Sequence, residues 1–225
     1  EDAILFLRAN RDRPFFLYLA HCAPHFPMQA QPEDIEKYRG RYRVGWDELR
    51  KRRYARQLKM GLVGKEWKLS PRPDYIPAWN SLDDAEKDFE DLRMAVYAGM
   101  VDCVDQNVGR RVKKLEARGA KDNTLIMFLS DNGGCPFDRR RTGTPGEPDS
   151  WWEYGVAWAN AGNTPFRLYK QNQHEGGIAT PFIVSWPAVI KNKAAIVDRP
   201  SHLVDIFATC VDCAGTDYHR KNQER

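Results

Sequence analysis

The sequence lacks an apolar run of the roughly 20 residues that a membrane-spanning helix needs, and its first residues lack the basic and then apolar pattern of a signal peptide. Its 35 basic and 31 acidic residues nearly balance, so the net charge of +4 does not indicate a nucleic-acid partner. Its five cysteines have no regular spacing, unlike the disulfide framework of small secreted domains. We therefore expect a globular chain with no membrane span and no nucleic-acid partner.

The chain also lacks a methionine at position 1 and opens inside an amphipathic helical pattern, so we expect part of a longer protein. Its 225 residues, of which 42% are hydrophobic, suffice for one substantial domain with a real core. We expect this domain to cover residues 1–215 and the polar residues 216–225 to form a frayed tail.

Apolar runs of strand length predict buried strands over residues 15–20, 125–129 and 182–186. An apolar stripe over residues 84–118, followed by Gly119, predicts a long helix that leads into the second of these strands. A helix that feeds a buried strand is the repeating step of doubly wound sheets. The sequence therefore predicts an α/β fold in which helices flank a mixed or parallel sheet.

Shorter helices are expected at the start of the chain, from about Gln31, and over residues 201–214. The core face of the last helix is expected to contain Leu203, Ile206, Phe207 and Cys210. Its C-x-x-C pair, Cys210 and Cys213, is expected to serve core packing rather than redox or metal chemistry. We expect residues 61–83 and 135–160 to form long loops that shape a binding site.

The predicted strand at 125–129 ends on oxygen-bearing side chains and glycines, from Ser130 to Gly134. The side chains of Asp131 and Asn132 offer hard oxygen donors, which suit calcium or magnesium. Asn-Gly is also a common turn dipeptide that reverses the chain without binding anything. The sequence leaves both interpretations open at this point.

Histidines and a lysine mark two other loops. His25 stands between Pro24 and Pro27, which restrict the backbone around it, so it is either a positioned acid-base group or a loop histidine bonded to backbone. Lys170 and His174 are four residues apart, a spacing that would place both on one face of a helix.

The segment from Arg39 to Lys59 is rich in basic and aromatic residues, as are surfaces that follow a nucleic-acid backbone. However, Trp46 and Leu49 have helical spacing, which favours a solvated helical face with its aromatic side turned inward. Asp102 and Asp105, within the long helix, could be paired carboxylates, but the sequence favours caps of, or salt bridges to, neighbouring elements.

Several phrases of the sequence, in this order, resemble the arylsulfatase-type, formylglycine-dependent sulfatases: residues 15–20 with 23–27, 129–134, 165–170 with 174–181, and 201–206. The resemblance implies the alkaline-phosphatase-like fold, here incomplete at its N-terminus, and hydrolysis of an aryl or carbohydrate sulfate ester. It implies a calcium ion, with magnesium less favoured. It also implies an exported protein, whether periplasmic, secreted or lysosomal.

The resemblance assigns roles to five positions. Asp131 and Asn132 match the later pair of metal ligands, and Lys170 matches the lysine that holds the sulfate oxygens. His25 matches the histidine that protonates or stabilises the leaving oxygen, and His174 is expected to face the substrate in a similar way. These types suit the chemistry, because cations must neutralise the sulfate oxygens and an acid must meet a poor leaving group.

The chain departs from the family pattern at the nucleophile. Sulfatases form formylglycine in a C-x-P/A-x-R motif, but Cys22 has Phe26 in place of the arginine, and Cys135 has Phe137 in place of proline or alanine. We therefore expect the nucleophile and two further aspartate ligands upstream, in a missing N-terminal part of the same catalytic domain. We expect this chain to be inactive alone.

Two other classes stay open. A phosphatase or phosphodiesterase of the same superfamily would share the fold, although Asn132 after Asp131 favours one metal and sulfate. A non-catalytic protein could bind sulfated glycans through residues 39–59 and Lys170.

Overall fold

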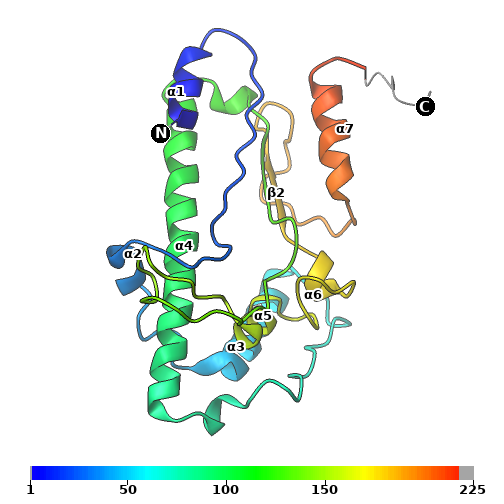
Figure 1. Cartoon of the computed structure of the whole chain (residues 1–225). Helices are drawn as coiled ribbons and strands as arrows, with labels where there is room; N and C mark the ends of the chain where they lie inside the picture. The colour runs from blue at the N-terminus through cyan, green and yellow to red at the C-terminus, as the bar shows by residue number, and fades with distance from the viewer. Residues whose placement is uncertain (1, 218–225) are drawn as a thin grey trace, which may run out of the picture. The chain divides into compact units, whose positions relative to one another are not determined.

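The structure is a computed structural model that describes residues 2–217 (Figure 1). The chain divides into a larger unit, residues 1–191, and a smaller unit, residues 192–225. The elements of the larger unit are α1 (Asp2–Ala9), α2 (Pro32–Glu36), α3 (Gly45–Met60), η1 (Trp79–Ser81), α4 (Asp84–Glu116), η2 (Lys121–Asn123), β1 (Ile126–Leu129), α5 (Val156–Gly162), α6 (Glu175–Ile178) and β2 (Phe182–Ser185). None of the helices in residues 2–217 combines the length and apolar character that crossing a bilayer requires.

Helix α4 confirms the predicted long helix, which Figure 1 shows in green. It begins in a capping box, in which the Asp83 carboxylate accepts from Glu86 N and the Glu86 carboxylate accepts from Asp83 N. Past its end, Gly119 adopts a left-handed backbone with a φ of 65°. Both ends of the helix are therefore set by local sequence.

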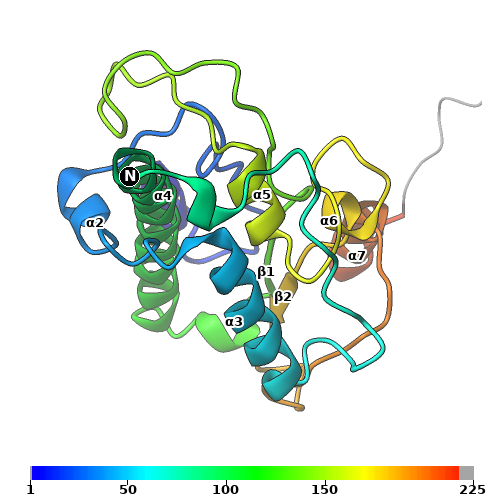
Figure 2. The same ribbon diagram turned by 90° about the horizontal axis from the view of Figure 1, so that it is seen from below.

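The core of the larger unit lies where α3, α4 and α5 meet. Trp46 of α3 packs edge-on against Trp79 and Trp158, with ring centroids 4.8 and 5.4 Å away. Gly45 has to be glycine there, because a Cβ atom would lie 2.1 Å from the Trp79 ring. Helix α3 packs against α5, as Figure 2 shows. This arrangement confirms that the aromatic side of residues 39–59 turns inward.

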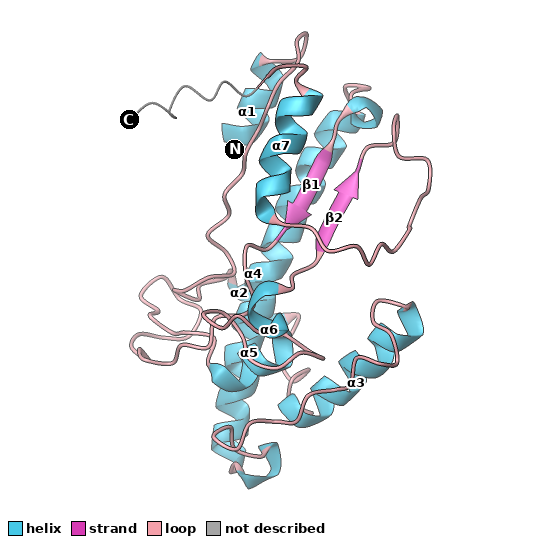
Figure 3. Ribbon diagram, turned by 90° about the vertical axis from the view of Figure 1, so that its right-hand side faces the viewer, coloured by secondary structure: helices cyan, strands magenta, loops and turns pink. Residues whose placement is uncertain are grey.

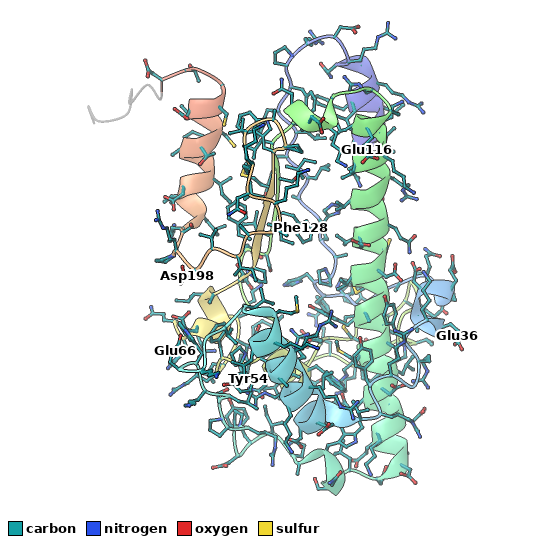
Figure 4. All side chains as sticks on the ribbon, turned by 180° about the vertical axis from the view of Figure 1, so that it is seen from behind. Glu36, Tyr54, Glu66, Glu116, Phe128 and Asp198 are labelled. Carbon is teal, nitrogen blue, oxygen red and sulfur yellow. The ribbon has the colours of Figure 1, made fainter. Side chains whose placement is uncertain are left out.

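The sheet of the described chain contains β1 and β2, which pair antiparallel with Ile126 opposite Ser185 and Leu129 opposite Phe182 (Figure 3). Two predicted strands, 125–129 and 182–186, are thus confirmed as strands. The expectation that they are buried is wrong for β2, in which every residue is exposed and Ile183 reaches 60%. Phe128 of β1, labelled in Figure 4, is also 43% exposed.

The strand predicted over residues 15–20 is wrong for this structure. The segment is irregular, and its Phe16 and Tyr18 side chains are 70% and 78% exposed. The physical reason is the lack of a pairing strand. Within residues 2–217 no strand pairs with this run, and an apolar run forms a strand only when another strand satisfies its backbone hydrogen bonds.

The smaller unit contains α7 (Leu203–Cys213), which confirms the predicted helix. His202 caps it, because its Nδ1 accepts from Val204 N at 3.2 Å and the Asp205 carboxylate accepts from His202 N at 2.7 Å. The predicted core face is not buried, since Leu203 and Phe207 are 48% and 58% exposed. No neighbouring element among residues 192–217 is available to cover it. Of the expected tail 216–225, residues 218–225 lie outside the described residues.

Candidate functional site

The turn that follows β1 is held by hydrogen bonds with the segment around α6. Gly133 N donates to Gly177 O at 3.0 Å, and Thr180 Oγ1 donates to Ser130 O at 2.8 Å. A Cβ atom on Gly133 would lie 1.8 Å from Gly176 O, so only glycine allows this approach. The glycines of the two loops therefore fix where Asp131 and Asn132 stand relative to α6.

The loop that carries Lys170 is tied to the same turn. Lys170 N donates to Gly134 O at 3.1 Å, and the Asn163 side chain accepts from Gly134 N at 3.0 Å and donates to Leu168 O at 3.2 Å. Leu168 and Gln171 have φ of 65° and 75°, a region that costs non-glycine residues about 1–3 kcal/mol. Such strain persists only where surrounding contacts impose it, and here it flanks Lys170 on both sides.

These contacts bring Lys170 to His25. Lys170 Nζ lies 3.2 Å from His25 Nε2, and His25 Nδ1 lies 3.1 Å from Phe26 O. A carbonyl oxygen only accepts and an ammonium only donates, so Nδ1 carries the proton and Nε2 presents its lone pair to Lys170. His25 is exposed, so both groups can reach a ligand from solvent.

The side chains of Asp131 and Asn132 are suitable ligands for a metal ion, but two residues are too few to bind one. Asp131 is exposed, and within residues 2–217 neither side chain has a hydrogen-bond or ion-pair partner, so their oxygens are free to coordinate. Calcium takes 6–8 oxygen ligands. In the same part of the chain, no group of three or more His, Cys, Asp or Glu side chains could hold a metal. The two residues are thus part of a donor set at most.

His174 precedes α6 and is exposed, with its carbonyl accepting from Gly177 N at 2.7 Å. Lys170 and His174 would share a face only on a helix, and the helix here begins after them, at Glu175. The left-handed backbone at Gln171 interrupts any helix between them.

Two residues of this site were not predicted from the sequence. Asn163 joins the two loops as described, and Tyr169 donates to or accepts from Tyr75 through hydroxyl groups 2.8 Å apart. Burial, with the hydrogen bond to Tyr75, raises the pKa of Tyr169. Tyr75 comes from the predicted loop 61–83, which therefore reaches the residue next to Lys170. The Asn-Thr-Pro phrase before the Lys170 loop was the available signal for Asn163.

Several arginines of the basic segment 39–59 are engaged by other parts of the chain. Arg39 pairs with buried Asp91 and with Asp88, and Arg43 also pairs with Asp88. Arg50 is buried and donates to Ser70 Oγ at 2.7 Å. These contacts give the segment a structural role. Asp102 likewise accepts from Lys37 and Gln106, which confirms its predicted salt bridge.

Comparison with known proteins identifies the family to which the chain belongs. The family model described as Sulfatase matches residues 1–216. An uncharacterized sulfatase of Schizosaccharomyces pombe is 36% identical over 92% of this chain and 39% of its own length. An arylsulfatase of Klebsiella aerogenes is 31% identical over 92% of this chain and 47% of its own length. The chain thus spans less than half the length of these relatives.

A solved structure shows the same fold. The crystal structure of Ps i-CgsB in complex with k-i-k-neocarrahexaose matches 97% of this chain and 33% of that chain, with 25% identity and a TM-score of 0.57. This match confirms the expected alkaline-phosphatase-like fold, of which the chain forms a part. With the family model matched over nearly all its residues, the chain belongs to the sulfatase family.

Proposed function

We propose that this chain supplies part of the catalytic centre of a sulfuric ester hydrolase that cleaves an aryl or carbohydrate sulfate. The observation that supports the proposal is the 3.2 Å approach of Lys170 Nζ to His25 Nε2, from loops far apart in the chain. The two residues place a cation and an acid-base group where one sulfate ester could contact both. Phosphate-ester hydrolysis remains the alternative, because a phosphate oxygen would suit the same lysine.

Lys170 binds the sulfate oxygens and offsets the charge that grows on them as the ester bond breaks. His25 serves the leaving oxygen. With Nδ1 held by Phe26 O, only Nε2 is available to the ligand. When a sulfate oxygen replaces Nε2 as the acceptor for Lys170, Nε2 is free to take up a proton and donate it to the departing oxygen.

Asp131 and Asn132 would hold a calcium ion, in preference to magnesium, together with ligands from outside this chain. When bound, such an ion polarises the sulfate oxygens. The free side-chain oxygens of both residues support this assignment. His174, exposed at the start of α6, would contact the substrate beyond the sulfate.

The nucleophile of the proposed reaction does not come from these residues, because the sequence has no C-x-P/A-x-R motif. We assign it to a complementary segment of the same catalytic domain, which would also cover the exposed residues of β2. The whole protein would be exported, as the family resemblance implies. The chain alone would therefore bind a sulfate ester without turning it over.

The proposal is tested by mixing the purified chain with 4-nitrophenyl sulfate and calcium, with no other protein. We expect binding, seen by NMR, and no release of 4-nitrophenol. Release that requires Lys170 would contradict the assignment of the nucleophile to another segment. Absence of binding would contradict the assignment of the sulfate site to Lys170 and His25.

A further inference from the structure

An arginine lies near two aromatic rings that contact each other, and one of these rings belongs to the residue after His25. The Arg140 guanidinium carbon is 6.0 Å from the centroid of the Phe26 ring and 5.7 Å from that of Trp151. The two rings are 5.7 Å apart and tilted by 46°. Phe26 follows His25 directly in the chain, and its carbonyl holds His25 Nδ1. We call Phe26, Arg140 and Trp151 the aromatic-arginine cluster.

The loop that carries the cluster is held in place. The buried Glu153 carboxylate accepts from the backbone N–H groups of both Arg139 and Arg140. Trp151 N donates to Thr142 O at 2.8 Å. The same loop is anchored further in, where Asp138 pairs with Arg93, which is only 3% exposed. These contacts hold the backbone from which the exposed Arg140 side chain extends.

Arg140 differs from Arg141 in having no anionic partner among residues 2–217. Arg141 pairs with Asp138 through two hydrogen bonds. Within residues 2–217 the Arg140 guanidinium has no hydrogen bond or ion pair, and its contacts are the two rings. A guanidinium held by stacking keeps its N–H fork free, and that fork matches the paired oxygens of a carboxylate or sulfate.

Trp151 adds an exposed ring to the cluster. Its side chain is 46% exposed, although tryptophan usually buries its large apolar face. An exposed aromatic face beside a free guanidinium suits a ring that is apolar on one side and carries an anion at its edge. A sulfated or carboxylated sugar ring has that character, whereas a simple aryl sulfate has no second anion.

We propose that the aromatic-arginine cluster is a subsite for a second oxyanion, sulfate or carboxylate, on a carbohydrate whose scissile sulfate lies at Lys170. The inference rests on the proposed function of Lys170 and His25, and it narrows the substrate class to sugars with at least two anionic groups. Arg140 binds the second anion, and Trp151 packs against the sugar ring.

The test compares two probes, galactose 6-sulfate and galactose 2,6-disulfate, by NMR titration of the full 225-residue chain. We expect the disulfate to bind about tenfold more tightly, which corresponds to one charge-assisted hydrogen-bonded contact at an exposed site. Arg140→Ala removes this preference, and Arg140→Lys restores only part of it, because an ammonium lacks the planar fork. Trp151→Ala weakens both probes by a similar factor.

Arg139→Ala is the matched control, because it removes the same charge from the adjacent position. The Arg139 guanidinium carbon lies over a different ring, 4.3 Å from the centroid of Phe137. The variant should keep the preference for the disulfate. The subsite would be overturned if Arg140→Ala kept the wild-type preference for the disulfate. It would also be overturned if Arg139→Ala lost that preference as fully as Arg140→Ala does.

Lys170→Ala separates this inference from the proposed function. If Lys170→Ala weakens the binding of both probes while Arg140→Ala leaves the ratio of their two affinities unchanged, only the subsite proposal fails. If neither probe responds to Lys170→Ala, or neither binds the wild type, the proposed function fails and the subsite with it.

Discussion

Lys170 Nζ lies 3.2 Å from His25 Nε2 although 145 residues separate them in the chain. This contact, together with that of His25 Nδ1 to Phe26 O at 3.1 Å, assigns the imidazole its tautomer. In the proposed function, Nε2 becomes available to the leaving oxygen when a ligand oxygen takes over as the acceptor for Lys170.

The tautomer is open to direct measurement. Nitrogen NMR of the ligand-free chain should show His25 protonated at Nδ1 and unprotonated at Nε2. Saturation with 4-nitrophenyl sulfate should move the Nε2 resonance toward the protonated value. His21, which is exposed and has no hydrogen-bond partner among residues 2–217, should not respond. An Nε2-protonated His25 in the free chain would contradict the assignment.

Gly133→Ala should destabilise the chain and disturb the site together. Its Cβ atom would lie 1.8 Å from Gly176 O, a backbone atom that cannot move without shifting α6. We expect the free energy of unfolding to fall by about 1–3 kcal/mol, as for overpacking. Denaturant titration would measure the change.

Gly109→Ala is the control for that variant. It lies within α4, and its added Cβ atom would meet nothing within 4 Å. Replacing a helical glycine with alanine should raise stability by roughly 0.5–1 kcal/mol. Equal losses from the two substitutions would show that the contact between the glycine loops is not what constrains Gly133.

The ion pair of Asp138 with Arg93 predicts acid sensitivity. Burial opposes ionisation of Asp138, but the hydrogen bond from Arg141 and the charges of Arg141 and Arg93 outweigh it and lower its pKa. The stabilisation is therefore present above the unfolded pKa, about 3.9, and is lost as pH falls through the lower folded value. Asp138→Asn should cost stability at pH 7 and progressively less at more acidic pH.

The control for Asp138→Asn is Asp105→Asn, because Asp105 is an exposed residue of α4 with no ion pair among the described residues. Its effect on unfolding should stay within about 0.5 kcal/mol at both pH values. A loss for Asp138→Asn that is the same at pH 7 and in acid would show that packing, and not charge, accounts for it.

The exposed face of β2 should tolerate polar substitution in this chain. Ile183, at 60% exposure, contributes little burial, so Ile183→Ser should change the free energy of unfolding by less than about 0.5 kcal/mol. Val96→Ala, at a position with no exposure, should cost about 1–3 kcal/mol. A large loss for Ile183→Ser in the isolated chain would mean that β2 is covered.

Local features of the fold were predictable from sequence because short-range rules control them. The apolar stripe of α4, its Asp83 cap and Gly119 define that helix without reference to the rest of the chain. The segment 15–20 was not predictable in this way. Its apolar run is typical of a strand, but a strand also needs a partner, and no local pattern reports whether one is present.

The candidate site was likewise predictable only in part. Resemblance to the sulfatases indicated His25 and Lys170, whereas no periodicity could have joined loops 145 residues apart. The spacing of Lys170 and His174 would place both on one face of a helix, but the left-handed backbones at Leu168 and Gln171 are incompatible with a helix there. Backbone contacts between Gly133, Gly134 and the Lys170 loop set the geometry, and such contacts have no sequence period.

The most direct test of the central claim is a titration of the purified chain with 4-nitrophenyl sulfate, followed at the His25 imidazole and repeated with Lys170→Ala. We predict a saturating response in the wild type, at least tenfold weaker binding in the variant, and no release of 4-nitrophenol in either. A His25 response that is unchanged in Lys170→Ala would contradict the claim that these residues form one sulfate-binding site.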